Sequence, residues 1–470
     1  MKRSKLFHIV SLGCPKNRVD SERILAVMTR EGFIHTADPE EAAVIVINTC
    51  AFIEPAVEES IEAILDSRHD NEHAALVVAG CLPLRYRDSL RKPLPEVDLF
   101  VVPDDIAELP RLVRTRLALR RSKSATRPSK VTIPPTCTRP RHGSSGREFD
   151  STARVLTTPG YAYLKIAEGC SRKCHFCTIP SIRGPLRSVK IDELERETRA
   201  LAAGGVRELV LVAQDLTRYG VDRTGRRELV HLLERLSSIH GIEWIRLMYL
   251  HPDGIPSGLS QMINGSPKIL PYLDIPFQHV SATVLRSMGR PWKGDRVRKL
   301  VNRLRKEIHG LVIRTTLMVG YPTEGEREFD ELKRFVESSD IERIGVFVYS
   351  PEEGTIAAGL GDPVPRSVKQ RRAQEIIAAH SRLLERLNRG KVGSLQRCLV
   401  EGVSEETDLL LKARCWDQAP EVDGALYITA GNAIAGEIHT ARITGFHGPD
   451  LFGEIIDAEL LPKTGLTSTH

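Results

Sequence analysis

The stretch Glu168–Pro180, EGCSRKCHFCTIP, is the most informative part of the chain. It carries Cys170, Cys174 and Cys177 in the spacing C-x-x-x-C-x-x-C. Three thiolates can hold three irons of a cubane cluster and leave the fourth iron open, whereas a closed electron-transfer cluster normally takes four cysteines. The spacing therefore predicts a 4Fe-4S cluster with one iron free to bind a ligand.

A zinc knuckle is the simplest alternative for this loop. Zinc sites usually pair one C-x-x-C with a second pair further along the chain, and His175 lies inside the loop, where it is poorly placed as a fourth ligand. The spacing instead resembles that of the radical S-adenosylmethionine (SAM) superfamily, in which the open iron binds SAM. Phe176, just before the third cysteine, also fits the pattern of that superfamily.

Composition sets limits on the class of protein. The chain has 470 residues, of which 41% are hydrophobic and 27% charged, as in a globular protein of roughly three domains. Its apolar start is broken by His8, and no stretch approaches the roughly 20 apolar residues that span a bilayer. Nine cysteines without a secretion signal favour reduced thiols and metal binding, and hence a cytoplasmic location.

Charge is unevenly distributed along the chain. Residues 111–150 contain eleven Lys or Arg against two acids, together with many Pro, Ser and Thr, which is typical of a basic linker. Residues 391–462 contain five Lys or Arg against twelve Asp or Glu, a net charge of −7. The C-terminal region is therefore predicted to be an acidic module.

Three further cysteines follow the apolar runs of the first hundred residues. The runs at 7–13, 42–49 and 74–80 are predicted to be parallel strands of an open α/β sheet, and Cys14, Cys50 and Cys81 come directly after them. Because the carboxyl ends of parallel strands share one edge, these cysteines are expected to converge there. Structural cysteines buried in a core remain the alternative.

The middle of the chain predicts a partial barrel. Six candidate strands alternate with helices between residues 161 and 350, whereas a closed barrel of this type needs eight. A helix from 365 to 389 is expected to end this core. A radical enzyme must exclude stray hydrogen donors, so the flanking domains are expected to cover the open side.

The last part predicts a small antiparallel β-barrel of about five strands, from its short alternating runs and Gly, Asp and Pro turns. The fold class is thus α/β with a C-terminal β-barrel. The predicted domains are an N-terminal domain over 1–118, a basic linker over 119–155, a core over 156–388, a barrel over 389–462 and a tail over 463–470.

Together, SLGCPKNRVDSE, VINTCAFI, VAGCLP and the EGCSRKCHFC loop resemble the methylthiotransferase family of radical SAM enzymes. That family has an N-terminal methylthiotransferase domain, a radical SAM core and a C-terminal TRAM β-barrel. The resemblance implies two 4Fe-4S clusters, an auxiliary one on Cys14, Cys50 and Cys81 and a radical SAM one on Cys170, Cys174 and Cys177. It also implies sulfur insertion into a C–H bond, with SAM as radical source and methyl donor.

Within the family the substrate is either a tRNA adenosine or an aspartate of the twelfth small-subunit ribosomal protein. SLGCPKN, YLKIAEGC, YLDIPFQH and QAPEVDG are similar to the ribosomal-protein branch, as is YSPEEGT. An acidic barrel also suits a basic protein better than RNA phosphates. We therefore predict the ribosomal protein as substrate, with an external electron donor and sulfur source, no membrane partner and a monomeric chain.

Five more residues are candidates for the SAM or substrate cavity, each with a plainer alternative. Gly204 and Gly205 resemble the glycine motif that contacts SAM, or form a helix C-cap. Gln214 and Asp215 end a predicted strand, with Thr217 and Tyr219 close behind, or belong to an ordinary turn. Arg314 is expected to meet a carboxylate of SAM or substrate, or to form a surface salt bridge.

The remaining cysteines, Cys137, Cys398 and Cys415, are interpreted as unrelated to the clusters. Two segments depart from the family pattern: GYPTEGE, at 320–326, where the family reads closer to GFPGET, and the long linker near 122–158. They affect the expected substrate contacts more than the reaction class. An iron-sulfur or RNA-binding adaptor that no longer cleaves SAM is the alternative that is not an enzyme.

Overall fold

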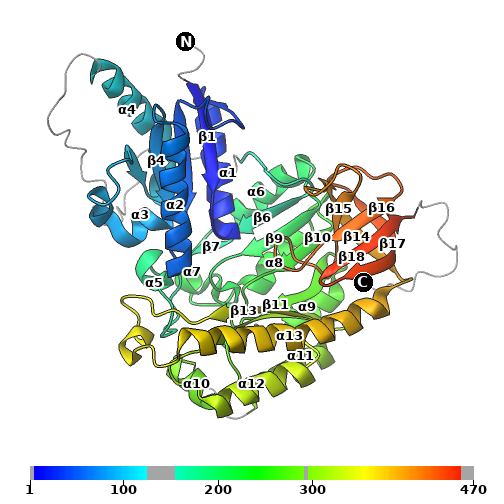
Figure 1. Ribbon diagram of the computed structural model, residues 1–470. Helices are drawn as coiled ribbons and strands as arrows, with labels where there is room; N and C mark the ends of the chain where they lie inside the picture. Colours follow the sequence, from blue (N-terminus) through cyan, green and yellow to red (C-terminus); the bar gives the residue numbers. More distant parts are fainter. Residues whose placement is uncertain (1–4, 124–153, 291–294, 457–470) are drawn as a thin grey trace. The chain divides into compact units, whose positions relative to one another are not determined.

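The computed structural model describes residues 5–123, 154–290 and 295–456 (Figure 1). The chain forms two compact units. Unit 1 comprises Met1–Thr157 together with Ile179–Gly184, and unit 2 comprises Thr158–Thr178 together with Pro185–His470. In the part of the chain that is described, no helix is long and apolar enough to cross a lipid bilayer.

Unit 1 is built on a parallel sheet of five strands in the order β2-β1-β3-β4-β5. All residues of β3 and β4 are buried, because helices cover both faces of these central strands. One face packs on α1 and α4 and the other on α2 and α3. The elements are β1 (Leu6–Ser11), α1 (Pro15–Arg30), β2 (Ile34–His35), β3 (Val44–Thr49), α2 (Glu54–Asp70), β4 (Ala75–Gly80), α3 (Cys81–Tyr86), η2 (Arg87–Arg91), β5 (Leu99–Val101), η3 (Pro103–Glu108) and α4 (Leu109–Lys123).

Unit 2 begins with six parallel strands in the order β13-β12-β11-β10-β9-β6, which confirms the predicted partial barrel. The strands are β6 (Tyr161–Lys165), β9 (Glu208–Val212), β10 (Trp244–Leu247), β11 (Ile269–Asp274), β12 (Val312–Val319) and β13 (Arg343–Val348). Two short strands, β7 (Ala167–Glu168) and β8 (Arg187–Ser188), form a separate antiparallel pair. Spatial order follows chain order, as expected for successive βα units.

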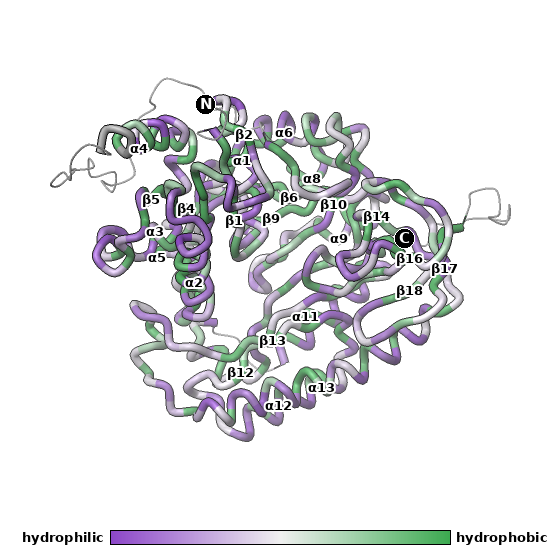
Figure 2. The backbone as a smooth tube through the Cα atoms, turned by 45° about the horizontal axis from the view of Figure 1, so that its top comes forward, coloured by the Kyte–Doolittle hydropathy of each residue, from purple (hydrophilic) through white to green (hydrophobic). Residues whose placement is uncertain are grey.

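Helices follow the core strands. They are α5 (Ile179–Ile182), α6 (Ile191–Ala203), η4 (Leu216–Arg218), α7 (Val221–Thr224), α8 (Leu229–Ser237), η5 (Pro252–Gly254), α9 (Leu259–Gly265), α10 (Ala282–Ser287), α11 (Arg296–Glu307), α12 (Glu326–Ser338), η6 (Ala357–Leu360) and α13 (Arg366–Lys391). Figure 2 shows hydrophilic and hydrophobic residues alternating along α12 and α13. This alternation is that of surface helices with one buried stripe, here Phe329, Leu332 and Phe335 on α12.

The C-terminal strands close into a barrel in the order β14-β15-β16-β18-β17. They are β14 (Leu395–Val403), β15 (Leu411–Cys415), β16 (Leu426–Ala430), β17 (Ile438–His447) and β18 (Asp450–Ile455). The barrel is antiparallel as predicted, except that β16 and β18 pair in parallel. This exception arises because β18 returns between β17 and β16 to close the barrel.

A buried ion cluster joins the barrel to the core sheet within unit 2. Glu208, at the start of β9, lies 2.7 Å from Arg246 of β10 and 2.7 Å from Arg414 of β15. All three side chains are almost fully buried. Burial alone would raise the pKa of Glu208, but the two guanidinium charges outweigh it and lower that pKa.

Backbone contact tightens the same junction. Gly160, just before β6, has a φ of +72°, and a Cβ atom there would lie 2.5 Å from the Cα atom of Gly436 in the barrel. Two glycines therefore allow the barrel backbone to approach the core closely.

Removing the barrel's arginine tests the junction. We expect Arg414→Met to lower the free energy of unfolding by about 3–5 kcal/mol, because Glu208 keeps one partner but loses the other in a buried site. Urea unfolding followed by tryptophan fluorescence measures this loss. Arg442→Met, which removes an exposed arginine from β17, is the matched control and should have little effect.

Candidate functional site

The three N-terminal cysteines lie at the carboxyl ends of three neighbouring strands in unit 1. Cys50 and Cys81 follow β3 and β4 directly, and Cys14 follows β1 by three residues and precedes α1. The strands are adjacent in the order β1-β3-β4. The expected convergence at one sheet edge is therefore what this topology produces.

Close packing and shared electrostatics show that the three thiols are neighbours. A Cβ atom at Gly13, whose φ is +87°, would lie 2.7 Å from the Cβ of Cys50, so the backbone before Cys14 passes against Cys50. Burial and, to a smaller extent, the charges of Cys81 and Cys14 raise the pKa of the Cys50 thiol to about 11. The Cys50 thiol therefore resists ionisation next to the other two.

Arg183 is a functional candidate that the sequence did not reveal. It belongs to Ile179–Gly184, the short segment that packs in unit 1. Its Nε and Nη2 atoms donate hydrogen bonds to Cys81 Sγ at 3.2 and 2.9 Å, and Nη2 also donates to Asn17 Oδ1 at 2.7 Å. A buried cation thus lies beside the predicted cluster ligands.

Cysteine side chains are the ligands that hold the irons of an iron-sulfur cluster. Among the described residues, no group of three His, Cys, Asp or Glu side chains is arranged to hold one metal ion. Burial opposes ionisation of Cys14, but the charges of Lys16 and Arg183 lower its pKa and favour the thiolate that iron binds.

The second group of cysteines occupies the loop after β7 in unit 2. The Cys177 amide donates to the Cys174 carbonyl at 3.2 Å, and the Arg172 amide donates to Cys170 Sγ at 3.4 Å. The Arg172 side chain donates to Asp215 Oδ2 at 2.7 Å and fastens the loop to the end of β9. This tight turn presents three partly exposed thiols from eight residues.

His175 and Phe176 have contacts of their own within the loop. His175 Nδ1 lies 2.9 Å from the Ser287 carbonyl, so its imidazole is hydrogen-bonded to the backbone at the end of α10. The guanidinium of Arg290 stacks over the Phe176 ring at 5.8 Å, and its Nη2 lies 4.0 Å from Cys174 Sγ. Arg290 is thus a second cation near a predicted ligand that the sequence did not reveal.

Positive charge gathers around this loop. Burial, together with the charges of Arg290, Arg172 and Arg218, lowers the pKa of His251 to about 2. His251 is therefore neutral, and its Nδ1 accepts a hydrogen bond from the Asp253 amide. Nearby cations suit a cluster held by three thiolates, whose ligands are negative.

Gln214 and Asp215 lie beside the loop, and both make contacts within the protein. Asp215 accepts from Arg172 and from the amide and hydroxyl of Thr217, so it clamps the loop and caps η4. Gln214 Nε2 donates to Glu168 Oε1 at 3.0 Å, and the Tyr219 hydroxyl donates to the Val189 carbonyl. Their predicted contact with SAM stays a prediction.

Gly204 and Gly205 lie elsewhere. They end α6 before β9, with their amides donating to Ala200 and Ala202 carbonyls, and Gly205 has a φ of +93°. This position is the amino end of β9, whereas the cysteine loop lies near the carboxyl ends of the core strands. The helix C-cap accounts for both glycines.

Arg314 corrects the sequence-based expectation. It lies near the amino end of β12, where it pairs with Asp274 at 3.4 Å and with Asp423 of the barrel at 3.3 Å. The carboxylate partners of Arg314 thus come from the chain itself. Its two salt bridges are buried and do not lie on the surface. Asp423 belongs to the QAPEVDG motif at 418–424 and also accepts from the Tyr272 hydroxyl.

Cys398 and Cys415 face each other across β14 and β15 and are fully buried in the barrel core. Cys137 and most of the long linker lie outside the described residues.

In the GYPTEGE segment, Glu324 is buried. It accepts hydrogen bonds from the Gly320 amide at 2.9 Å and from Arg372 at 2.8 Å, and its carboxylate also faces the imidazole of His279. This loop is ordered by its own buried glutamate.

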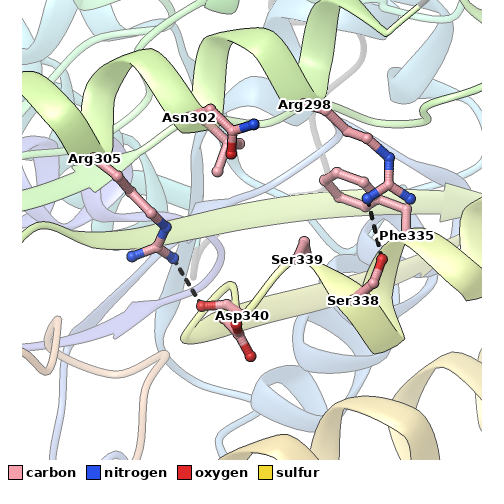
Figure 3. Close-up of a pocket in the computed structure, with 8 residues that line it drawn as sticks. Arg298, Asn302, Arg305, Phe335, Ser338, Ser339 and Asp340 are labelled. Carbon is pink, nitrogen blue, oxygen red and sulfur yellow. Dashed lines mark hydrogen bonds between the residues drawn. The ribbon is translucent and has the colours of Figure 1, made fainter.

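A separate surface groove of about 400 Å³ lies between α11 and the end of α12 (Figure 3). Arg298 donates to Ser338 at 3.0 Å, and Arg305 donates to the Asp340 carbonyl at 2.7 Å. None of the residues that the sequence singled out lines it. The groove is therefore not the candidate site.

Family comparisons match all three parts of the chain. Uncharacterized protein family UPF0004 matches residues 6–102, the radical SAM superfamily matches 164–336, and the TRAM domain matches 392–456. A protein from Geobacter sulfurreducens named ribosomal protein uS12 methylthiotransferase RimO is 44% identical over 95% of this chain and 98% of its own. The chain belongs to the RimO methylthiotransferase family.

A second relative carries the same name. The Aquifex aeolicus protein of the same name is 42% identical over 96% of this chain and 97% of its own. RimO-type proteins are radical SAM enzymes that use SAM and 4Fe-4S clusters. Among solved structures, the radical SAM methyltransferase TsrM from Kitasatospora setae is similar with a TM-score of 0.52 at 14% identity, over 73% of this chain and 72% of its own, which shows a shared fold.

One substitution tests the loop as a cluster site. We expect Cys174→Ala to abolish SAM cleavage, measured as 5′-deoxyadenosine, and to lower bound iron, because two thiolates do not retain the core cluster. Cys398→Ala, in the barrel core, is the control and should keep both iron and cleavage. Deoxyadenosine formation by Cys174→Ala at the normal rate would contradict the assignment.

Proposed function

We propose that this enzyme inserts a methylthio group at the β-carbon of an aspartate of the twelfth small-subunit ribosomal protein, uS12. Two groups of three cysteines, one at the strand-end edge of the unit 1 sheet and one in the loop after β7, each beside a cation, support the proposal most directly. RimO-type relatives over nearly the full chain carry the name of this reaction.

Cys170, Cys174 and Cys177 hold the radical SAM cluster in this proposal. The bound cluster and SAM supply the one-electron chemistry that opens an unactivated C–H bond and the methyl group that is transferred. The chain keeps the three thiols in one short loop, and Arg172 with Asp215 fixes that loop. Arg290 places its positive charge at the Cys174 sulfur.

Cys14, Cys50 and Cys81 hold the auxiliary cluster. Three ligands again leave one iron open, which suits a group that must bind sulfur and release it to a substrate. Burial of Cys50 and Cys81 keeps water from this centre. Two open clusters match a reaction that both activates a carbon and delivers sulfur.

The barrel favours a basic protein partner over RNA. Of its acids, Glu401 and Asp423 are bound inward by arginines, but Glu405, Glu406 and Asp408 are exposed on the loop after β14. Exposed carboxylates repel a phosphate backbone and attract Lys-rich and Arg-rich surfaces. An external electron donor, an external sulfur source, a cytoplasmic location and a monomeric chain complete the proposal.

The substrate is tested in cells with and without this gene. Intact mass and peptide mapping of uS12 should show the mass of one methylthio group in place of one hydrogen on a single aspartate, only when the gene is present. Unmodified uS12 together with a lost methylthio-nucleoside in tRNA would move the enzyme to the tRNA branch of its family.

A second variant separates the two clusters. We expect Cys50→Ala to keep SAM cleavage and to stop formation of methylthiolated uS12, because it removes a ligand of the auxiliary cluster alone. Deoxyadenosine and the modified uS12 peptide are measured in the same reaction. Product formation by Cys50→Ala would show that the auxiliary cluster does not carry the sulfur.

A further inference from the structure

A short segment of the radical SAM loop folds into the other unit. Ile179–Gly184 follows the last loop cysteine closely, yet it packs within unit 1. Ile182 is 5% exposed and belongs to the hydrophobic cluster that covers one face of the N-terminal sheet. The segment is therefore anchored there by apolar burial, and it carries Arg183 next to Cys81.

Two N–H groups of Arg183 point at one sulfur atom. Nε and Nη2 lie 3.2 and 2.9 Å from Cys81 Sγ, the forked geometry that guanidinium groups form with anions. A neutral thiol is a weak acceptor, whereas a thiolate is a strong one. The fork therefore has the geometry of a donor to a sulfur that binds iron as a thiolate.

Neighbouring groups hold the guanidinium in this orientation. Nη2 donates to Asn17 Oδ1 at 2.7 Å, and Nη1 lies 3.4 Å from Asp20. Asn17 is itself fixed, because its Nδ2 donates to the Leu12 and Thr49 carbonyls at the ends of β1 and β3. The Arg183 side chain is only 3% exposed, so its position is set by packing as well as by hydrogen bonds.

Arg183 is thus a buried cation in direct contact with a ligand of this centre. Hydrogen bonds to cluster sulfurs and nearby positive charge both stabilise the reduced, more negative state of an iron-sulfur cluster.

We propose that Arg183 is a positioning residue of the auxiliary cluster. Arg183 holds the Cys81 sulfur in place and raises the reduction potential of that cluster. This inference rests on the proposed function, since it assumes a cluster on Cys14, Cys50 and Cys81. Residues 177–183 thus begin with Cys177, a ligand of the core cluster. They end with Arg183, which donates hydrogen bonds to a ligand of the auxiliary cluster.

The test is a redox titration of the auxiliary cluster in the full-length protein, followed by electron paramagnetic resonance. The Cys174→Ala background removes the signal of the core cluster. In this background Arg183→Gln should lower the ratio of reduced to oxidised cluster at a fixed potential at least tenfold, which corresponds to a midpoint lower by about 59 mV for one electron. Iron bound per chain should stay at the level of one cluster.

A matched control is available on α3. Arg85 lies four residues after Cys81 and donates to the Ala51 carbonyl at 2.9 Å. Arg85→Gln removes the same charge from the same unit but leaves both hydrogen bonds to Cys81 Sγ in place, so its midpoint should shift far less than that of Arg183→Gln. Arg183→Lys keeps the charge and loses the fork, so its midpoint should lie between that of the Cys174→Ala background and that of Arg183→Gln.

The midpoint potentials of these variants decide whether the proposal holds. An unchanged midpoint in Arg183→Gln with full iron, or equal shifts in Arg183→Gln and Arg85→Gln, would overturn the proposal. If Arg183→Gln does not retain its cluster, Arg183→Lys supplies the measurement, and an unchanged midpoint there would likewise overturn it. The readout is independent of uS12, so a wild-type enzyme inactive on uS12 would refute the proposed function and leave this result standing.

Discussion

The structure depends on one geometric constraint: the carboxyl ends of all strands in a parallel sheet lie at the same edge. Unit 1 uses this constraint to bring together three cysteines from distant parts of the sequence, one after each of three adjacent strands. The core supplies its three cysteines from a single eight-residue loop instead. The same kind of donor set is thus built once by tertiary topology and once by local spacing.

Cations accompany the cysteines at both centres. Arg183 contacts Cys81 in unit 1, and Arg290 approaches Cys174 in unit 2, while Arg172 fixes the loop backbone through Asp215. In the function proposed above, these side chains would offset the negative charge of the thiolate ligands and orient them.

The barrel has two electrostatic faces. Its buried charges, such as Arg414 and Asp423, pair with the core and fix the barrel to the strand sheet, whereas its exposed acids face outward. The QAPEVDG motif therefore serves the junction through Asp423, although the sequence suggested it only as a mark of the substrate branch. A net acidic module can thus be docked by arginines and still present carboxylates to a basic partner.

The sequence by itself determined the fold class, the two cysteine groups and the family, because spacing, strand periodicity and strand-end position are local properties. It did not determine the partners of Arg314, the role of Asp215 as a clamp, or the presence of Arg183 and Arg290 beside ligands. Nor did it distinguish the C-cap at Gly204 and Gly205 from a cofactor contact. These features depend on which side chains meet across long separations, such as Arg183 and Cys81, and only packing in three dimensions decides that.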